Sequence, residues 1–449
     1  MNKIEKFLES NDYPLIVAFI GTIAWILPKD FIWLNNILMI ILVCTFVFVL
    51  SLFKNTKYII PILLSLVFTL NVAEIGVAEI TGFTIYHLIV ILMLIGLTVH
   101  LIRFKHKFEF DYIALGLMLI AISYLIPMAY MPLSSLMFSI SITGIIYVLF
   151  YLFFISTAKV TTDDVLNYFF FASIQLLVIM LYSMGTNFIQ LIKNNSLEET
   201  IAIGLNNSWG SSDYGFGNIN DLNIHLAILS SGIFYKIIKH PKNYFYWLFA
   251  ILYVVLIVFS GSRGGAITLV LLLFSYYIML YVYGTKEQII IVNVLLFVVM
   301  GLAFAFKDMF LIFFENFLQD GVEDMNSFSS GRIQLYKDAI EIFKKYPVFG
   351  AGWTTFEAEN VNRIQVFHST IFHTLAISGI FGLISVFIFT VACFTTILKK
   401  LNKNVLLLGV PWTITMLHGL IDNTIHMVIY TLLTMVVFTA IRKEEEIIV

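Results

Sequence analysis

Charged residues are scarce in this sequence. Asp, Glu, Lys and Arg make up 12% of its 449 residues, about half of the quarter that soluble globular domains carry. A chain with so few charges has too little polar side-chain surface to cover a single water-soluble core. Hydrophobic residues reach 60%, and apolar runs near the length of about 18 residues that a membrane helix needs recur along the chain. The composition therefore predicts a polytopic membrane protein.

The sequence also lacks the patterns of a metal centre, a disulfide framework or a nucleotide-binding domain. Its two cysteines, Cys44 and Cys393, lie inside apolar runs without metal-ligand spacing, and we interpret them as small core residues. No HExxH cluster, P-loop or GxGxxG unit occurs. A net charge of −2 without a basic block gives no sign of nucleic acid. We expect no metal, no cofactor and no nucleic-acid partner.

Apolar runs occur about fourteen times. They lie at about residues 13–28, 32–53, 58–73, 84–102, 111–128, 135–156, 166–186, 222–238, 244–260, 264–283, 288–306, 369–397, 404–421 and 424–441. Helices are expected, because lipid satisfies no backbone polar group and the runs lack the alternation of membrane strands. The fold class predicted is all-α and polytopic, with about 14 transmembrane helices.

Lysine and arginine predict how these spans are oriented. If the N-terminus is cytoplasmic and all fourteen runs cross, seventeen of the 26 Lys and Arg residues fall on cytoplasmic segments. Three fall on short outer loops and six in the segment 307–366. Both termini are then cytoplasmic, and 307–366 is one large extracytoplasmic loop.

The same pattern divides the chain into four parts. They are N-terminal transmembrane helices (1–192), transmembrane helices with an outer Asn- and Gly-rich loop and a Ser-Arg-Gly turn (193–306), the large outer loop (307–366) and C-terminal transmembrane helices (367–449). The cytoplasmic loops are too short for a nucleotide-binding domain. A reaction at the outer face must use a donor that has already crossed the membrane, and a lipid-linked donor fits this requirement.

The segment Ser260-Gly-Ser-Arg-Gly-Gly265 is predicted at an outer turn before an inward-running helix. Free N–H groups and the positive end of the helix dipole favour an anion there. Glycines such as Gly264 allow a phosphate to approach the backbone beside Ser262, and Arg263 can bind it bidentately. The alternative is a tight glycine hairpin whose arginine reaches the lipid headgroups.

The outer segment 326–353 is predicted to contain an amphipathic helix. One apolar face is formed by Ile333, Tyr336, Ile340 and Phe343. Ser329 or Ser330 can cap this helix, and Pro347 with the glycines after it ends it. Arg332 lies in the first turn, which is the unfavourable end for a cation unless an anion shares the site. The alternative is an interfacial helix that only contacts headgroups.

Histidines and carboxylates gather at the same outer level. His368 is predicted at the start of an inward-running span, where an imidazole can take a proton from a sugar hydroxyl near neutral pH. His373 follows five residues later and lies on a different face of the helix. Further candidate substrate-binding residues are Asn220, Asp221, His225, Asp422 and His426. In both Asp–His pairs the carboxylate precedes the histidine by four residues, so it could orient the ring on one helix face. For Asn218, Asn220 and Asn423 we favour helix capping.

Several of these segments, taken in order, resemble the O-antigen polymerase and O-antigen ligase superfamily (Wzy-type and WaaL-type). The matching elements are Gly217-Asn-Ile-Asn220, Ser262-Arg-Gly264, Arg332 before an amphipathic helix, Tyr346-Pro-Val-Phe-Gly-Ala-Gly352, His368-Ser369 and Ser378-Gly-Ile-Phe-Gly382. The resemblance covers about residues 205–395. The family often has His-Asn where this chain has His368-Ser369, so a role for the second residue is in doubt.

The resemblance implies a GT-C-like, metal-independent, inverting glycosyltransferase in the cytoplasmic membrane. Its donor and acceptor would be undecaprenyl-diphosphate-linked glycans, polymerised at the outer face into capsule, O-antigen or exopolysaccharide. Arg263 and Arg332 would bind the diphosphate and His368 would act as the base. Besides membrane lipids, a chain-length regulator and a flippase are the implied partners. A ligase that uses another acceptor remains open, as does a polysaccharide flippase from a different class.

Overall fold

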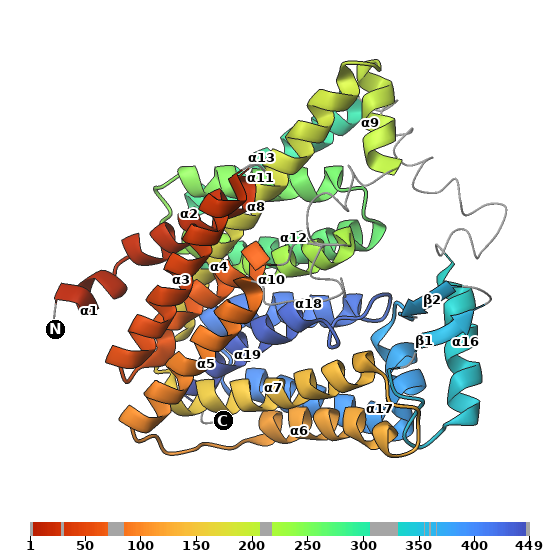
Figure 1. Cartoon of the computed structure of the whole chain (residues 1–449). Helices are drawn as coiled ribbons and strands as arrows, with labels where there is room; N and C mark the ends of the chain where they lie inside the picture. Colours follow the sequence, from red (N-terminus) through yellow and green to blue (C-terminus); the bar gives the residue numbers. More distant parts are fainter. Residues whose placement is uncertain are drawn as a thin grey trace. The chain divides into compact units, whose positions relative to one another are not determined.

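The computed structural model describes residues 3–27, 31–70, 85–206, 218–305, 331–353, 355–358, 361–364 and 366–445 (Figure 1). Within these ranges, each of the fourteen predicted apolar runs coincides with a helix. The helices are α1 (Lys3–Leu8), α2 (Asp12–Ile26), α3 (Ile32–Leu52), η2 (Thr56–Ile59), α4 (Ile60–Leu70), α5 (Ile85–Arg103), α6 (Tyr112–Leu125), η4 (Ile126–Ala129), α7 (Ser135–Thr157), α8 (Thr162–Ile192), α9 (Leu197–Asn206), α10 (Ile219–Lys239), α11 (Phe245–Phe259), α12 (Arg263–Tyr283), α13 (Lys286–Ala305), α16 (Arg332–Lys345), α17 (Thr370–Lys399), α18 (Lys403–His418) and α19 (Val428–Lys443).

Among the described residues, six helices are long and apolar enough to cross a membrane. They are Trp33–Leu52, Tyr112–Ala129, Met137–Thr157, Thr162–Ile192, Arg263–Tyr283 and Thr370–Lys399. A short antiparallel pair, β1 (Thr355–Ala358) and β2 (Val361–Ile364), lies between α16 and α17. The fold is that of an all-α membrane protein, whereas the count of fourteen spans and their orientation remain predictions.

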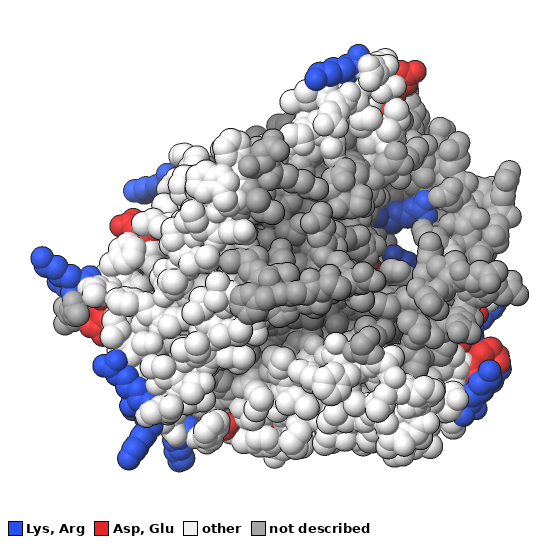
Figure 2. All heavy atoms as spheres, in the orientation of Figure 1, with Lys and Arg blue, Asp and Glu red and all other residues white. Residues whose placement is uncertain are grey.

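The chain forms two compact units. The first contains 1–107, 157–290 and 406–411, and the second contains 108–156, 291–405 and 412–449. In the first unit α8 packs closely on α10, where a Cβ atom added to Gly232 would lie 2.2 Å from the backbone nitrogen of Phe170. Figure 2 shows that charged side chains are few on the face drawn, as the composition requires.

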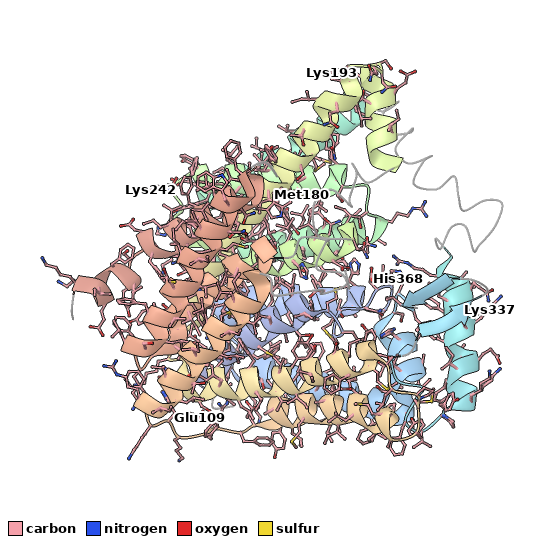
Figure 3. All side chains as sticks on the ribbon, in the orientation of Figure 1. Glu109, Met180, Lys193, Lys242, Lys337 and His368 are labelled. Atoms are coloured by element: carbon pink, nitrogen blue, oxygen red, sulfur yellow. The ribbon has the colours of Figure 1, made fainter. Side chains whose placement is uncertain are left out.

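In the second unit, the residues predicted on opposite sides of the membrane lie at opposite ends. Arg442 forms ion pairs with Glu109 (2.7 Å) and Asp111 (3.1 Å), all three from segments predicted at the cytoplasmic face. Figure 3 labels Glu109 at one end of this unit and His368 and Lys337, both predicted outside, at the other. The folded unit is therefore compatible with the predicted orientation.

Helix α16 confirms the predicted amphipathic helix but corrects two of its details. Its N-cap residue is Gly331, in the left-handed conformation and without a capping side chain. The predicted caps Ser329 and Ser330 lie outside the described residues. The face that packs on α17 contains Leu335, Ala339 and Ile342.

The predicted apolar face of α16 is thus only partly correct. Tyr336 does pack on α17, stacking on Phe372 with ring centroids 4.4 Å apart, but Ile340 is 39% exposed. Ala339 on this face is fully buried. A search for large apolar residues at helical spacing overlooks an alanine, although a small residue is what allows two helix backbones to come close.

Helix α17 is broken at Gly379, whose φ of 60° and ψ of −156° are not helical. The chain that follows α16 crosses α17 at this break. Four hydrogen bonds join the two backbones: Ala351 N–H to Ala376 O (2.8 Å), Gly352 N–H to Ile377 O (2.9 Å), Ile380 N–H to Pro347 O (2.9 Å) and Phe381 N–H to Val348 O (3.0 Å). The crossing segment therefore satisfies backbone groups that a broken membrane helix would leave unpaired.

We call this arrangement of residues 347–352 and 376–381 the backbone crossing. It depends on two glycines with positive φ, Gly350 (73°) and Gly379 (60°). A Cβ atom on Gly350 would lie 2.2 Å from the backbone of Ile377, and one on Gly379 would lie 2.6 Å from that of Val348. Only glycine fits either position. The motifs Tyr346–Gly352 and Ser378–Gly382, which are 26 residues apart in the sequence, thus form one structural element. This element holds the end of α16 against α17.

Candidate active site

The start of α17 is joined to the turn between α18 and α19, which runs over residues 419–427. The N–H of Thr370 donates to the carbonyl oxygens of Gly419 (2.8 Å) and Asp422 (3.0 Å). The N–H of Ser369 donates to the side-chain oxygen of Asn423 (3.0 Å). These N–H groups of the helix start are already bonded within the protein, so an anion bound beside them needs another partner.

His368 and Asp422 form a hydrogen-bonded pair at this junction. The Nδ1 atom of His368 lies 3.3 Å from Oδ1 of Asp422, whose side chain is only 2% exposed. An ionised carboxylate can only accept hydrogen bonds, so Nδ1 carries the proton in this contact. The Nε2 atom then has an available lone pair on a side chain that is 34% exposed. This is the geometry of a general base that a buried carboxylate orients.

Arg332 completes the cluster. Its Nη1 donates to the carbonyl oxygen of Ile421, and its Nη2 lies 3.8 Å from Oδ2 of Asp422. Burial by itself raises the pKa of Asp422, but its hydrogen bond with His368, the N–H of Asn423 and the charge of Arg332 together hold that pKa below its ordinary value. Asp422 is therefore charged at neutral pH. A guanidinium has five N–H donors, so Arg332 can hold this contact and still bind a phosphate.

The backbone at His368 is strained. Its φ of 41° is the one positive value at a non-glycine residue among the described positions. The hydroxyl of Tyr336 on α16 donates to the carbonyl oxygen of His368 (3.1 Å), which helps to hold this conformation. A left-handed conformation at a bulky residue persists where the surroundings over-determine it, and such positions cluster at functional sites.

The structure corrects the predicted pairing of Asp422 with His426. The two residues do not share a helix face, because α18 ends at His418 and α19 begins at Val428. Asp422 turns to His368 instead. The ring nitrogens of His426 lie 2.8 Å from the hydroxyl of Tyr124 and 3.0 Å from that of Thr374, so both are engaged within the protein.

His373 is fully buried in α17. Its ring lies against those of Trp353 (centroids 4.5 Å apart) and His426 (4.8 Å). Its Nδ1 accepts the N–H of Phe367 at 3.5 Å, and its Nε2 has no hydrogen-bond partner among the described residues. These contacts favour packing over catalysis for His373, and a substrate contact of either buried histidine remains a prediction.

The first unit contains the other predicted phosphate site. Ser262 is the N-cap of α12, and its hydroxyl accepts the N–H of Gly265 (2.9 Å). The same hydroxyl donates to Oδ1 of Asn220 (2.5 Å), which joins the two motifs that precede α10 and α12. The predicted capping role of Asn218 is confirmed, because Asn218 is the N-cap of α10 and its side chain accepts the N–H of Asn220, whereas Asn220 itself lies within the first turn of the helix. Arg263 and Gly264 lie in the first turn of α12, as predicted.

The second predicted Asp–His pair lies in the same unit. Asp221 is in the first turn of α10, and His225 follows on the buried part of that helix, 2% exposed and with its ring 6.1 Å from that of Phe68. Neither ring nitrogen of His225 has a partner among the described residues. Contact of these two residues with a substrate remains a prediction.

The sequence interpretation missed the partners that give His368 its geometry. Asp422 was assigned to the wrong histidine, Tyr336 was counted as an apolar residue, and Asn423 was expected to cap a helix. No local signal connects these positions with His368, because 54 residues separate Asp422 from it. The sequence does show one feature that these residues share. All of them lie in or next to segments predicted at the outer face.

A comparison with protein families gives a match. Residues 248–387 match a family model described as O-antigen ligase. The comparison with curated proteins gave no significant match. The matched region contains Arg263, Arg332 and His368 together with both halves of the backbone crossing. This part of the chain belongs to the O-antigen polymerase and ligase superfamily.

Proposed function

We propose that this protein polymerises undecaprenyl-diphosphate-linked oligosaccharide repeat units into surface polysaccharide at the outer face of the cytoplasmic membrane. The observation that carries the proposal is the cluster of His368, Asp422 and Arg332. It combines an oriented base with a cation at one end of an apolar helix bundle. Glycosyl transfer from a lipid diphosphate needs both, because a hydroxyl must lose its proton while negative charge develops on the departing diphosphate.

In the proposed reaction, Nε2 of His368 takes the proton of an acceptor hydroxyl. The hydroxyl oxygen forms a bond to the anomeric carbon of the donor, with inversion. The bond from that carbon to the diphosphate breaks, and its electron pair leaves with the diphosphate. Arg332 stabilises the charge on this group, and Asp422 stabilises the imidazolium that forms. Arg263 is proposed to bind phosphate at the start of α12.

A ligase is the second candidate, because the matching family model is described as O-antigen ligase. The two differ only in the acceptor, which is another lipid-linked repeat unit for a polymerase and a different molecule for a ligase. The comparison lends no support to a flippase.

The test is incubation of the purified protein with its undecaprenyl-diphosphate-linked repeat unit. A ladder of lengthening products supports a polymerase, whereas transfer only to an added second acceptor supports a ligase. His368→Ala and Arg332→Ala should each accumulate as folded protein and give no product. Full-length ladders from both variants would reject the assigned chemistry.

A further inference from the structure

An apolar groove of about 480 Å³ lies along α17 and the end of α18 in the second unit. Its walls include Leu383, Phe387, Thr390 and Phe394 from α17, and Thr413 and Leu417 from α18. Phe387 is 67% exposed and Leu417 is 53% exposed. The hydroxyl of Thr390 donates to the carbonyl oxygen of Val386 (2.8 Å) on its own helix. Its wall is therefore almost entirely hydrocarbon.

The groove ends at the candidate active site. Its lining includes Thr370, Gly419 and Leu420. Thr370 and Gly419 are joined by the hydrogen bond that ties the start of α17 to the turn. The residue after Leu420 is Ile421, whose carbonyl oxygen accepts from Arg332. One end of the apolar surface therefore adjoins the cationic side chain that the proposed function assigns to the diphosphate.

The other end lies within the hydrocarbon-facing part of α17. Leu383 and Phe394 are eleven residues apart beyond the break at Gly379, which corresponds to about 16 Å of helix. This is about half of a hydrocarbon core of about 30 Å. At its far end Phe394 packs against Trp412, with ring centroids 5.4 Å apart. The groove can hold the first part of a long chain, and the remainder would continue into lipid.

We infer that this groove binds the first isoprene units of the polyprenyl chain whose diphosphate meets Arg332. The inference rests on the proposed function, which supplies a lipid-diphosphate donor. Two features select this occupant over bulk lipid. One end of the groove is lined by Leu420, next to Ile421, whose carbonyl oxygen accepts from the cation Arg332. Deeper in the groove the walls are apolar apart from threonines, and the hydroxyl of Thr390 is bonded to its own helix. Placing the chain here positions the bond that breaks beside His368.

The test compares two donors with the same glycan and diphosphate, one on undecaprenol and one on a single isoprene unit. Thr390→Trp and Thr413→Trp fill the groove from opposite walls. Val391→Trp is the matched control, because Val391 is the neighbouring residue, is 45% exposed and does not line the groove. For both groove variants we expect the KM of the undecaprenyl donor to rise at least tenfold relative to that of the short donor. The control should keep the wild-type ratio.

Equal KM ratios in wild type, both groove variants and the control would overturn the groove while leaving the proposed function intact. A wild-type protein that uses neither donor would instead overturn the proposed function. In that case photocrosslinking tests whether the groove binds a polyprenyl chain, because it does not require catalysis. With p-benzoylphenylalanine at position 387 and undecaprenyl diphosphate in mixed vesicles, a polyprenyl adduct that is absent with the probe at position 391 supports the inference. Phospholipid adducts alone at both positions would overturn it.

Discussion

The Nδ1 atom of His368 lies 3.3 Å from Oδ1 of Asp422, although 54 residues separate the two in the chain. The contact joins His368, two residues before the start of α17, to the turn between α18 and α19. The same turn provides the carbonyl oxygen that binds Arg332. The proposed base His368, the carboxylate of Asp422 and the guanidinium of Arg332 therefore all contact one irregular segment, and each can be changed separately.

Asp422→Asn should remove the charge and keep the shape. An amide can donate to Nδ1 of His368, which would move the ring proton to Nε2 and block its action as a base. We expect kcat for chain growth to fall by about 10²- to 10⁴-fold, the usual contribution of general-base catalysis, with little change in KM. Initial rates with purified protein measure this. Glu341→Gln, which removes an exposed carboxylate of α16, is the control and should retain the wild-type rate.

The stability of the protein should depend on the charge of Asp422. Its pKa is held below the ordinary value in the fold, so the ionised form contributes stability above the unfolded pKa of about 3.9. That contribution is lost as the pH falls through the folded pKa. The melting temperature in detergent, measured from pH 7 to pH 3, should therefore drop more for the wild type than for Asp422→Asn. Parallel curves for the two proteins would contradict this.

Gly379→Ala should be strongly destabilising. It forces a side chain into the left-handed region, at about 1–2 kcal/mol, and places its Cβ 2.6 Å from the backbone of Val348. Gly331→Ala separates the two effects, because Gly331 has a φ of 78° but, among the described residues, no atom within 4 Å of an added Cβ. Gly185→Ala has neither effect and should be neutral or stabilising. Thermal unfolding of the three variants should rank Gly379→Ala lowest, then Gly331→Ala, then Gly185→Ala. Equal melting temperatures for the first two would show that the crossing tolerates a side chain.

Helical regions were predictable from the sequence because long apolar runs carry that information locally. The segment 404–421 was read as one span, yet α18 stops at His418. An apolar stretch containing Leu420 and Ile421 gives no local sign that the helix has ended. The helix spacing argument for Asp422 and His426 failed for this reason, since it assumes a helix that the turn interrupts.

The backbone crossing could not be predicted from the sequence either, because it depends on contacts between segments that are distant in the chain. The glycines at 350, 352 and 379 were visible, and those at 350 and 352 were correctly placed after the end of α16. The packing of Gly350 against Ile377 and of Gly379 against Val348 depends on hydrogen bonds between two backbone segments that are distant in the sequence. The candidate residues His368 and Arg332 could be chosen from their expected position at segment ends. Their shared contact with Asp422 could not be predicted in this way.

The contact between Asn220 and Ser262 leads to a prediction for the first unit. Ser262 donates to Asn220 (2.5 Å) and accepts from Gly265 (2.9 Å), so Asn220 fixes the rotamer with which Ser262 caps α12 beside Arg263. Asn220→Ala removes the acceptor and should lower the free energy of unfolding by about 1 kcal/mol. Asn220→Asp keeps an acceptor oxygen and should be close to wild type in stability.

Arg263→Ala should separate binding from folding in the same unit. Because Ser262 and Asn220 hold the start of α12 without it, the melting temperature should stay near the wild-type value. If Arg263 binds the diphosphate, the KM of the lipid-linked donor should rise, and Arg263→Lys should restore it only in part because an ammonium cannot bind bidentately. A donor KM unchanged in Arg263→Ala would reduce the role of this arginine to contacts with headgroups and leave Arg332 as the diphosphate ligand.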